Sequence, residues 1–282
     1  MFHMEHGNKK MFDILIVGAG HAGVEAAYTS SQFSSLKIGL LTLPEVGIAS
    51  APCNPSIGGV GKGQVVREID SLGGITGKLA DLAGIQFRTL NESKGYAVQS
   101  TRVQIDKVLY SKYADEIINA ISNITVIKDK VVNVSSFEGY FSVQAECSTW
   151  NTKKIIFTVG TFLNGKLHTG SEQESGGRSD SDVSAGLEDI FKDIRTVPAR
   201  FKTGTPARIN KKSINYSLLE EQPSDNSVET FHVLHGTKYR KQKQLSCYLG
   251  YTNSETMKVI RDNKEKSPMF NGQINAIGAR YC

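Results

Sequence analysis

Three glycines near the amino terminus have the spacing of a dinucleotide-binding turn. Gly18, Gly20 and Gly23 form the pattern Gly-x-Gly-x-x-Gly. In such a turn the first glycine permits a tight bend, and the second lets the backbone approach a pyrophosphate. The third lets the following helix pack closely against the strand. Because the first N–H groups of that helix face the phosphates, residues 18–23 predict a dinucleotide site.

The residues around this turn predict the elements that would position it. An apolar strand over residues 12–17 precedes the turn, a helix continues from Val24, and a second strand follows over residues 37–42. This βαβ order indicates a doubly wound α/β sheet. The acid that usually ends the second strand and holds a ribose is missing, because the nearest acid is Glu45, beyond a proline. The turn alone does not separate FAD from NAD.

A second glycine-rich loop, residues 52–63, contains Cys53. It is not a P-loop, because Ser56 stands where the first glycine is required and Gly63 where a magnesium-binding hydroxyl is required. The basic group of the nearby Lys62 favours a reactive thiolate in this glycine-rich loop, so Cys53 is a candidate catalytic residue. The alternative is a small buried apolar side chain.

Composition narrows the class of protein. The longest apolar runs of the 282 residues are far too short to cross a bilayer, and residues 1–10 are polar, with no signal-peptide pattern. Four cysteines without metal-ligand spacing fit a reducing compartment, so we expect a cytoplasmic protein, no membrane and no metal site.

Basic residues are concentrated toward the carboxyl terminus. Residues 195–243 contain ten Lys or Arg against four acids, a net charge of +6. The whole chain has a net charge of +5, so the remaining residues sum to about −1. Such a segment suits a polyanionic partner such as nucleic acid, or is a solvated surface. The texture of the sequence also changes here, which predicts a domain over residues 11–199 and an inserted domain over residues 200–282.

Further elements follow from local patterns. Helical spacing predicts helices over residues 64–72 and 101–121. Short strands are expected at 124–127, 131–134, 140–143 and 153–159, the last closed by the Thr158-Val-Gly160 ending of many two-dinucleotide flavoproteins. Cys147 is expected in the core and Cys247 in a strand over residues 245–249.

Taken together, several segments closely resemble the MnmG (GidA) flavoproteins. The matching segments are Gly18–Ala27, Cys53–Gly63, Ala83–Arg88, Gly160–Gly165, Lys202–Pro206 and Arg280–Cys282. The resemblance implies an enzyme that helps add a carboxymethylaminomethyl-type group to C5 of the wobble uridine of tRNA. It further implies bound FAD, NADH or NADPH as reductant, methylene-tetrahydrofolate as one-carbon donor, the MnmE GTPase as partner, and a homodimer. The expected fold is a Rossmann-like FAD-binding domain, a three-layer doubly wound sheet with an inserted mixed α/β domain.

The resemblance also assigns residues. It places Cys53 and Cys282 in the chemistry, where a thiol could add at C6 of the uracil or move a proton. Its implied cofactor-binding residues are Gly18, Ala19, Gly20, His21, Ala22, Gly23, Val131, Ser184, Gly278, Arg280 and Tyr281, the last three at the start of a nicotinamide-binding stretch.

This chain departs from the family pattern in three places. Gln99 stands where the family usually has an arginine, and Ala279 replaces a proline. The family's C-terminal helical domain is expected to be absent, so the isolated chain is expected to be poorly soluble and inactive. Two alternatives remain open: an inactive FAD-binding fragment, and a folate- and FAD-dependent tRNA uracil methyltransferase of the TrmFO type.

Overall fold

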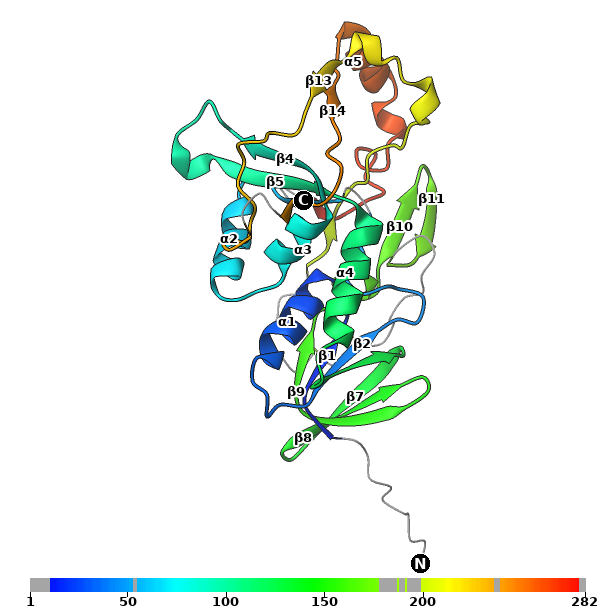
Figure 1. The fold of residues 1–282 in the computed structure, drawn as a ribbon. Coiled ribbons are helices and arrows are strands. Elements are labelled where there is room, and N and C mark those ends of the chain that lie inside the picture. Colours follow the sequence, from blue (N-terminus) through cyan, green and yellow to red (C-terminus); the bar gives the residue numbers. More distant parts are fainter. Residues whose placement is uncertain are drawn as a thin grey trace, which may run out of the picture.

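A computed structural model describes residues 11–52, 55–177, 187, 191, 199–235 and 239–278. Its largest sheet has six strands in the order β6-β2-β1-β9-β8-β7 (Figure 1). The four strands β6, β2, β1 and β9 are parallel, whereas β8 and β7 extend the sheet antiparallel. The bounds are β1 (Met11–Val17), β2 (Ile38–Thr42), β6 (Ile124–Lys128), β7 (Val131–Phe137), β8 (Tyr140–Ala145) and β9 (Thr149–Phe157).

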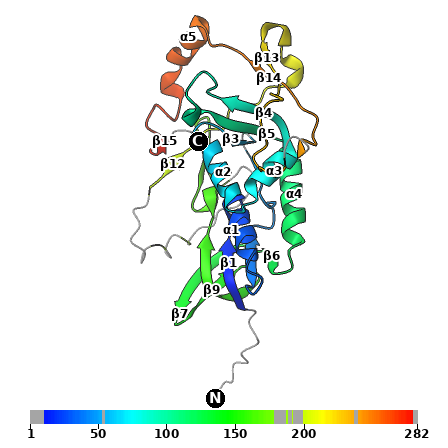
Figure 2. The ribbon, with the colours of Figure 1, turned by 60° about the vertical axis from the view of Figure 1, so that its left-hand side comes forward.

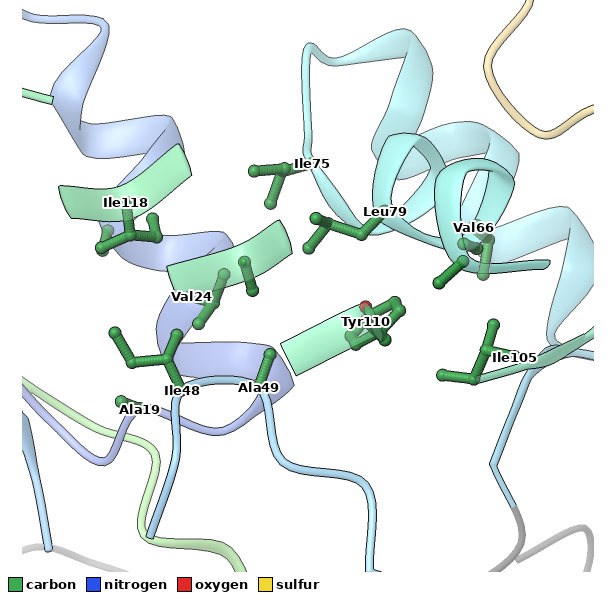
Figure 3. Close-up of a cluster of buried hydrophobic side chains, with 14 of the residues drawn as sticks. Ala19, Val24, Ile48, Ala49, Val66, Ile75, Leu79, Ile105, Tyr110 and Ile118 are labelled. Carbon is green, nitrogen blue, oxygen red and sulfur yellow. The ribbon is translucent and has the colours of Figure 1, made fainter. Parts of the chain in front are cut away.

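Two helices cover one face of this sheet, α1 (His21–Ser31) and α4 (Lys107–Asn119). Val24, Tyr110 and Ile118 point from these helices into a core cluster that also receives residues from α2 and α3 (Figure 3). The opposite face carries a separate cluster, in which Val131 and Val143 pack with Leu15 and Val17. Side chains of β7 and β8, which belong to the same sheet, therefore also pack on this opposite face.

A smaller antiparallel sheet lies beyond the carboxyl ends of the parallel strands (Figures 1 and 2). Its strand order is β3-β5-β4, with β3 (Ser56–Gly58), β4 (Gly84–Leu90) and β5 (Ser100–Ile105). The helices α2 (Gly63–Ser71) and α3 (Thr76–Ala83) connect β3 to β4. Glu25 of α1 accepts hydrogen bonds from the N–H groups of Ile75 and Thr76, so it caps α3 and joins the two parts.

The predicted helix over residues 101–121 is wrong in its first third. Residues 100–105 form β5, which pairs with β3 and β4, and α4 begins only at Lys107. Asp106 marks the change, because its carboxylate accepts hydrogen bonds from the N–H groups of Val108 and Leu109. Such a side-chain cap starts a helix. The prediction over residues 64–72 is confirmed by α2, whereas α3 and β4 were not predicted.

The remaining elements are short. A hairpin of β10 and β11 follows η2, β12 pairs with β15, and β13 pairs with β14, which confirms a strand at Cys247. Cys147, in contrast, is exposed rather than in the core, because it lies in the turn between β8 and β9. Their bounds are η1 (Tyr96–Val98), η2 (Gly160–Phe162), β10 (Lys166–Thr169), β11 (Glu172–Ser175), β12 (Phe201–Lys202), η4 (Lys211–Ser213), η5 (Tyr216–Leu218), β13 (Glu220–Gln222), β14 (Cys247–Leu249), α5 (Ser254–Asp262), η7 (Lys264–Lys266) and β15 (Ile277–Gly278).

Residues 224–235 and 239–245, here called the strap, run back along the free edge of β4. Asp225 donates its N–H to the carbonyl of Phe87, and Leu245 donates to that of Ile85. Phe231 of the strap is fully buried in the same core cluster as α1 and α4. The strap therefore ties residues beyond 200 to the first part of the chain, and the predicted boundary at 199/200 stays a prediction.

Two buried carboxylates hold the strap in place. Asp81 of α3 accepts the N–H groups of Phe231 and His232 at 2.8 and 2.9 Å. The imidazole Nδ1 of His232 lies 2.7 Å from the carboxylate of Asp70 in α2.

In the part of the chain that the structure describes, no helix has the length and apolar character needed to span a membrane.

Candidate functional site

The glycine turn between β1 and α1 has a backbone that larger residues would disrupt. Gly18 has a φ of 108°, and a Cβ there would lie 2.5 Å from the carbonyl oxygen of Thr158. Thr158 follows β9 and donates its hydroxyl to the carbonyl of Gly18 at 2.7 Å. The Thr-x-Gly ending of β9 thus fixes the turn from the neighbouring strand.

The other two glycines have opposite surroundings. A Cβ on Gly23 would overlap the carbonyl oxygen of Gly18, so the helix packs directly against the turn. A Cβ on Gly20 would meet no atom within 4 Å, so this position is open to a ligand. These are the packing and approach roles that the spacing predicts for a dinucleotide turn.

A cavity of about 320 Å³ lies at this turn. Its walls come from the carboxyl ends of β1, β2 and β9 and from the segments that follow β2 and β6, which is where open α/β sheets bind ligands. The surface is mainly apolar. The lining residues used below are Gly18, Ala19, Gly20, His21, Ala22, Thr42, Pro52, Asp129, Val131 and Thr158.

The start of α1 gives the cavity its main polar character. Gly20 caps the helix without a side-chain hydrogen bond, and the first turn contains no acid. The N–H groups of this turn therefore face the cavity with the partial positive charge of a helix terminus, which suits an anion. Burial lowers the pKa of His21, so its ring is neutral near pH 7. The Nδ1 of His21 lies 3.4 Å from the hydroxyl of Tyr110.

The acid expected to hold a ribose is not Glu45, which is exposed and outside the cavity wall. Asp129, which follows β6, is the carboxylate that lines the cavity, and the sequence reading missed it. It is 4% exposed and accepts the N–H groups of Lys130 and Cys147 and the hydroxyl of Ser148. Asp129 directly follows β6, and a carboxylate at the carboxyl end of a parallel strand is the sequence pattern that could have predicted its place in the cavity.

The predicted site residues fall into three groups. Gly18, Ala19, Gly20, His21, Ala22 and Val131 line one cavity, with Gly23 packed behind it. Gly278 ends β15 and pairs with Lys202 rather than lining this cavity. Five residues lie outside the described part of the chain: Cys53, Ser184, Arg280, Tyr281 and Cys282. Binding and catalytic roles for all of these stay predictions.

The departure at Gln99 has a structural consequence. Its side-chain amide donates to the carbonyls of Glu92 and Lys94 at 3.2 and 3.0 Å, so it closes the loop between β4 and β5. Where the family has an arginine, this chain therefore has a neutral side chain hydrogen-bonded to its own backbone.

Among the described residues, no group of three or more His, Cys, Asp or Glu side chains could hold a metal ion.

Comparison with known families decides the relationship. The sequence model of the family described as glucose inhibited division protein A matches residues 13–282. The chain belongs to the GidA family. It is 41% identical over 279 residues to the tRNA uridine 5-carboxymethylaminomethyl modification enzyme MnmG of Sulfurihydrogenibium sp. (strain YO3AOP1), covering 96% of this chain and 45% of the relative. It is 43% identical to MnmG of Buchnera aphidicola subsp. Cinara cedri (strain Cc), with 96% and 43% covered.

Solved structures of the GidA family agree. Aquifex aeolicus GidA in its form I crystal superposes with a TM-score of 0.84 at 37% identity, over 97% of this chain and 46% of that one. The form II crystal gives a TM-score of 0.82 over 91% of this chain and 44% of that one. The predicted Rossmann-like fold class is confirmed. This chain spans less than half the length of the GidA relatives that it matches.

Proposed function

We propose that this GidA-family chain is the FAD-binding part of an enzyme that modifies C5 of the wobble uridine of tRNA. The observation that carries the proposal is the cavity at residues 18–22, where an uncapped helix terminus meets an open Gly20. The MnmG relatives are tRNA uridine 5-carboxymethylaminomethyl modification enzymes, which supports the reaction class.

The turn suits the pyrophosphate of FAD. Gly20 lets the phosphates approach, the first N–H groups of α1 donate to them, and the apolar wall that includes Val131 accommodates the adenine side. When bound, FAD supplies hydride transfer, and the protein supplies position and electrostatics. The thiols of Cys53 and Cys282 activate the uracil, one by adding at C6 and the other by moving a proton.

The remaining parts of the proposal rest on the family resemblance. NADH or NADPH reduces the flavin, and methylene-tetrahydrofolate provides the one-carbon unit. Ser184 contacts FAD, and Gly278, Arg280 and Tyr281 begin the nicotinamide site. The chain acts in the cytoplasm with the MnmE GTPase and as a homodimer, and its domains divide near residue 199.

The flavin site is tested by two matched glycine replacements. Gly20→Val places a branched side chain in the open approach to the cavity, whereas Gly95→Val adds the same side chain at another position where a Cβ meets no atom within 4 Å. We expect Gly20→Val to lower FAD affinity at least tenfold, measured by flavin fluorescence quenching, and Gly95→Val to leave it unchanged. Equal affinity in both variants would contradict the site.

The reaction is tested in cells whose only copy of the gene carries Cys53→Ser or Cys282→Ser. Both changes should abolish the modified wobble uridine, measured by mass spectrometry of tRNA nucleosides. The control is Cys147→Ser, because Cys147 is exposed in a turn. A normal amount of modified nucleoside in either cysteine variant would refute the proposed chemistry. Loss of 5-methyluridine instead would favour the TrmFO-type methyltransferase.

A further inference from the structure

Two arginines stand side by side on the small sheet, and neither forms an ion pair with a described residue. Arg88 of β4 and Arg102 of β5 are directly opposed in the antiparallel register. Opposed residues project their side chains to the same face, only about 5 Å apart at Cβ. Two like charges in this arrangement destabilise a sheet. Their juxtaposition therefore calls for a compensating negative charge.

No described residue pairs directly with either guanidinium. Neither guanidinium forms an ion pair or a hydrogen bond, and the Nε atoms of both are buried without a partner. Both side chains are half-buried rather than fully solvated. Other arginines here do find acceptors: Arg208 donates to the carbonyl of Pro52, and Arg200 to that of Leu163.

The nearest acid serves a different purpose. Asp225 of the strap lies close enough to Arg88 and Arg240 for both to lower its pKa, but its carboxylate is engaged mainly by Ser227. Arg240 adds a third positive charge beside β4, with its guanidinium 4.3 Å from the ring centre of Phe87. Asp225 is therefore shared between Arg88 and Arg240, and the second carboxylate near Arg240 is Asp81.

We propose that Arg88 and Arg102 together bind a phosphate group, and that its source is a backbone phosphodiester of the tRNA. Paired guanidinium groups present planar forks of N–H donors that match phosphate oxygens. The position supports this source, because Arg102 pairs across the sheet with Gly58 of β3, only a few residues after Cys53. A phosphate held here positions the RNA beside the loop of the proposed catalytic cysteine. The inference deepens the proposed function and rests on it for the identity of the RNA.

The test compares Arg88→Gln, Arg102→Gln and the double variant with Arg261→Gln, which removes the same charge from the exposed end of α5. Binding of fluorescently labelled tRNA is followed by anisotropy over a series of salt concentrations. Each single variant should bind roughly tenfold more weakly, and the slope of log affinity against log salt should fall by about one. Arg261→Gln should retain the wild-type slope. FAD affinity should be the same in all variants, which excludes the flavin pyrophosphate as the source.

A second measurement separates this inference from the proposed function. The thermal midpoint of the wild-type chain is compared in inorganic phosphate and in chloride at equal ionic strength. A phosphate-dependent rise that disappears in the double variant, without tRNA binding by the wild type, would keep the phosphate site and reject the RNA. If the Gln variants fail to fold, Arg→Lys replacements are used instead; because they keep the charge but lose the planar fork, they should keep the wild-type salt slope and still bind tRNA more weakly. Wild-type tRNA affinity and phosphate response in the double variant would overturn the inference.

Discussion

Replacement of Phe231 by Ala should detach the strap. Phe231 is fully buried, and two glycines lie against its side chain, one at the ring tip and one at Cβ. A Cβ on Gly58 would lie 2.7 Å from its Cζ, and a Cβ on Gly77 would lie 3.2 Å from its Cβ. The guanidinium of Arg67 lies 5.9 Å from the ring centre. The tip of the ring thus packs against the backbone of Gly58, whereas the contact with Gly77 involves Cβ, which alanine keeps.

The size of the effect follows from that packing. Truncation of a buried Phe to Ala costs about 3–5 kcal/mol, and the cost is greatest where neighbours cannot collapse into the cavity. Gly58 has no side chain to move into the space left by the ring. The loss should therefore lie in the upper half of this range. The backbone N–H of Phe231 donates to Asp81, and alanine keeps this hydrogen bond. The expected loss therefore comes from the missing ring alone.

Two readouts locate the loss. Trp150, the only tryptophan, lies in β9 of the main sheet and reports its unfolding in urea by fluorescence. Hydrogen exchange of residues 224–235 reports the strap. If the strap and the main sheet unfold as one unit, the free energy of unfolding from Trp150 falls by about 4 kcal/mol. If the strap opens alone, only its exchange accelerates, by a factor on the order of a thousand.

Opening of the strap alone would support a domain division near residue 199. Unfolding of the strap and the main sheet as one unit would not. Phe33→Ala is the control, because Phe33 is 64% exposed, and its change should stay within about 0.5 kcal/mol. A Phe231→Ala chain that matches the control in both readouts would refute the packing argument.

Two further changes test other contacts. Gly23→Ala should lower the free energy of unfolding by at least about 1–3 kcal/mol, because the added methyl overlaps the carbonyl of Gly18, whereas Gly95→Ala should have little effect in the same urea titration. Burial, together with the charges of His232 and Lys78, lowers the pKa of His235 from 6.5 to about 4. The unfolded chain therefore takes up this proton first, and stability is lost as the pH falls from 6.5 to 4, by about 3 kcal/mol. Burial raises the pKa of Asp81 from 3.8 to about 6. The folded chain therefore takes up this proton first, and as the pH falls from 6 to 3.8 the free energy of unfolding rises by about 3 kcal/mol. His235→Gln should thus gain about 3 kcal/mol relative to wild type between pH 7 and pH 4, and a constant difference between the two proteins at both pH values would contradict this.

Local sequence determined the cofactor-type turn and the strands beside it. In residues 18–23 the first glycine permits the turn, the second lets a ligand approach and the third lets the helix pack closely. All three requirements fall within six residues, so the sequence alone predicts the turn. The apolar runs that became β1, β2 and β9 are equally local, and each is flanked by a turn. The start of α4 is also set locally, because the side chain of Asp106 caps its first turn.

Tertiary structure decided what depends on residues far apart in the chain. Residues 100–105 are a strand because β3 and β4 lie on both sides of them, not because of their own periodicity. The strap has no regular pattern, since side chains and single backbone groups of α2, α3 and β4 hold it. Nor does the sequence bring Arg88 next to Arg102, because the length of the intervening loop leaves the register open. Only the pairing of β4 with β5 places the two charges side by side, since strand register is set by contacts across the sheet.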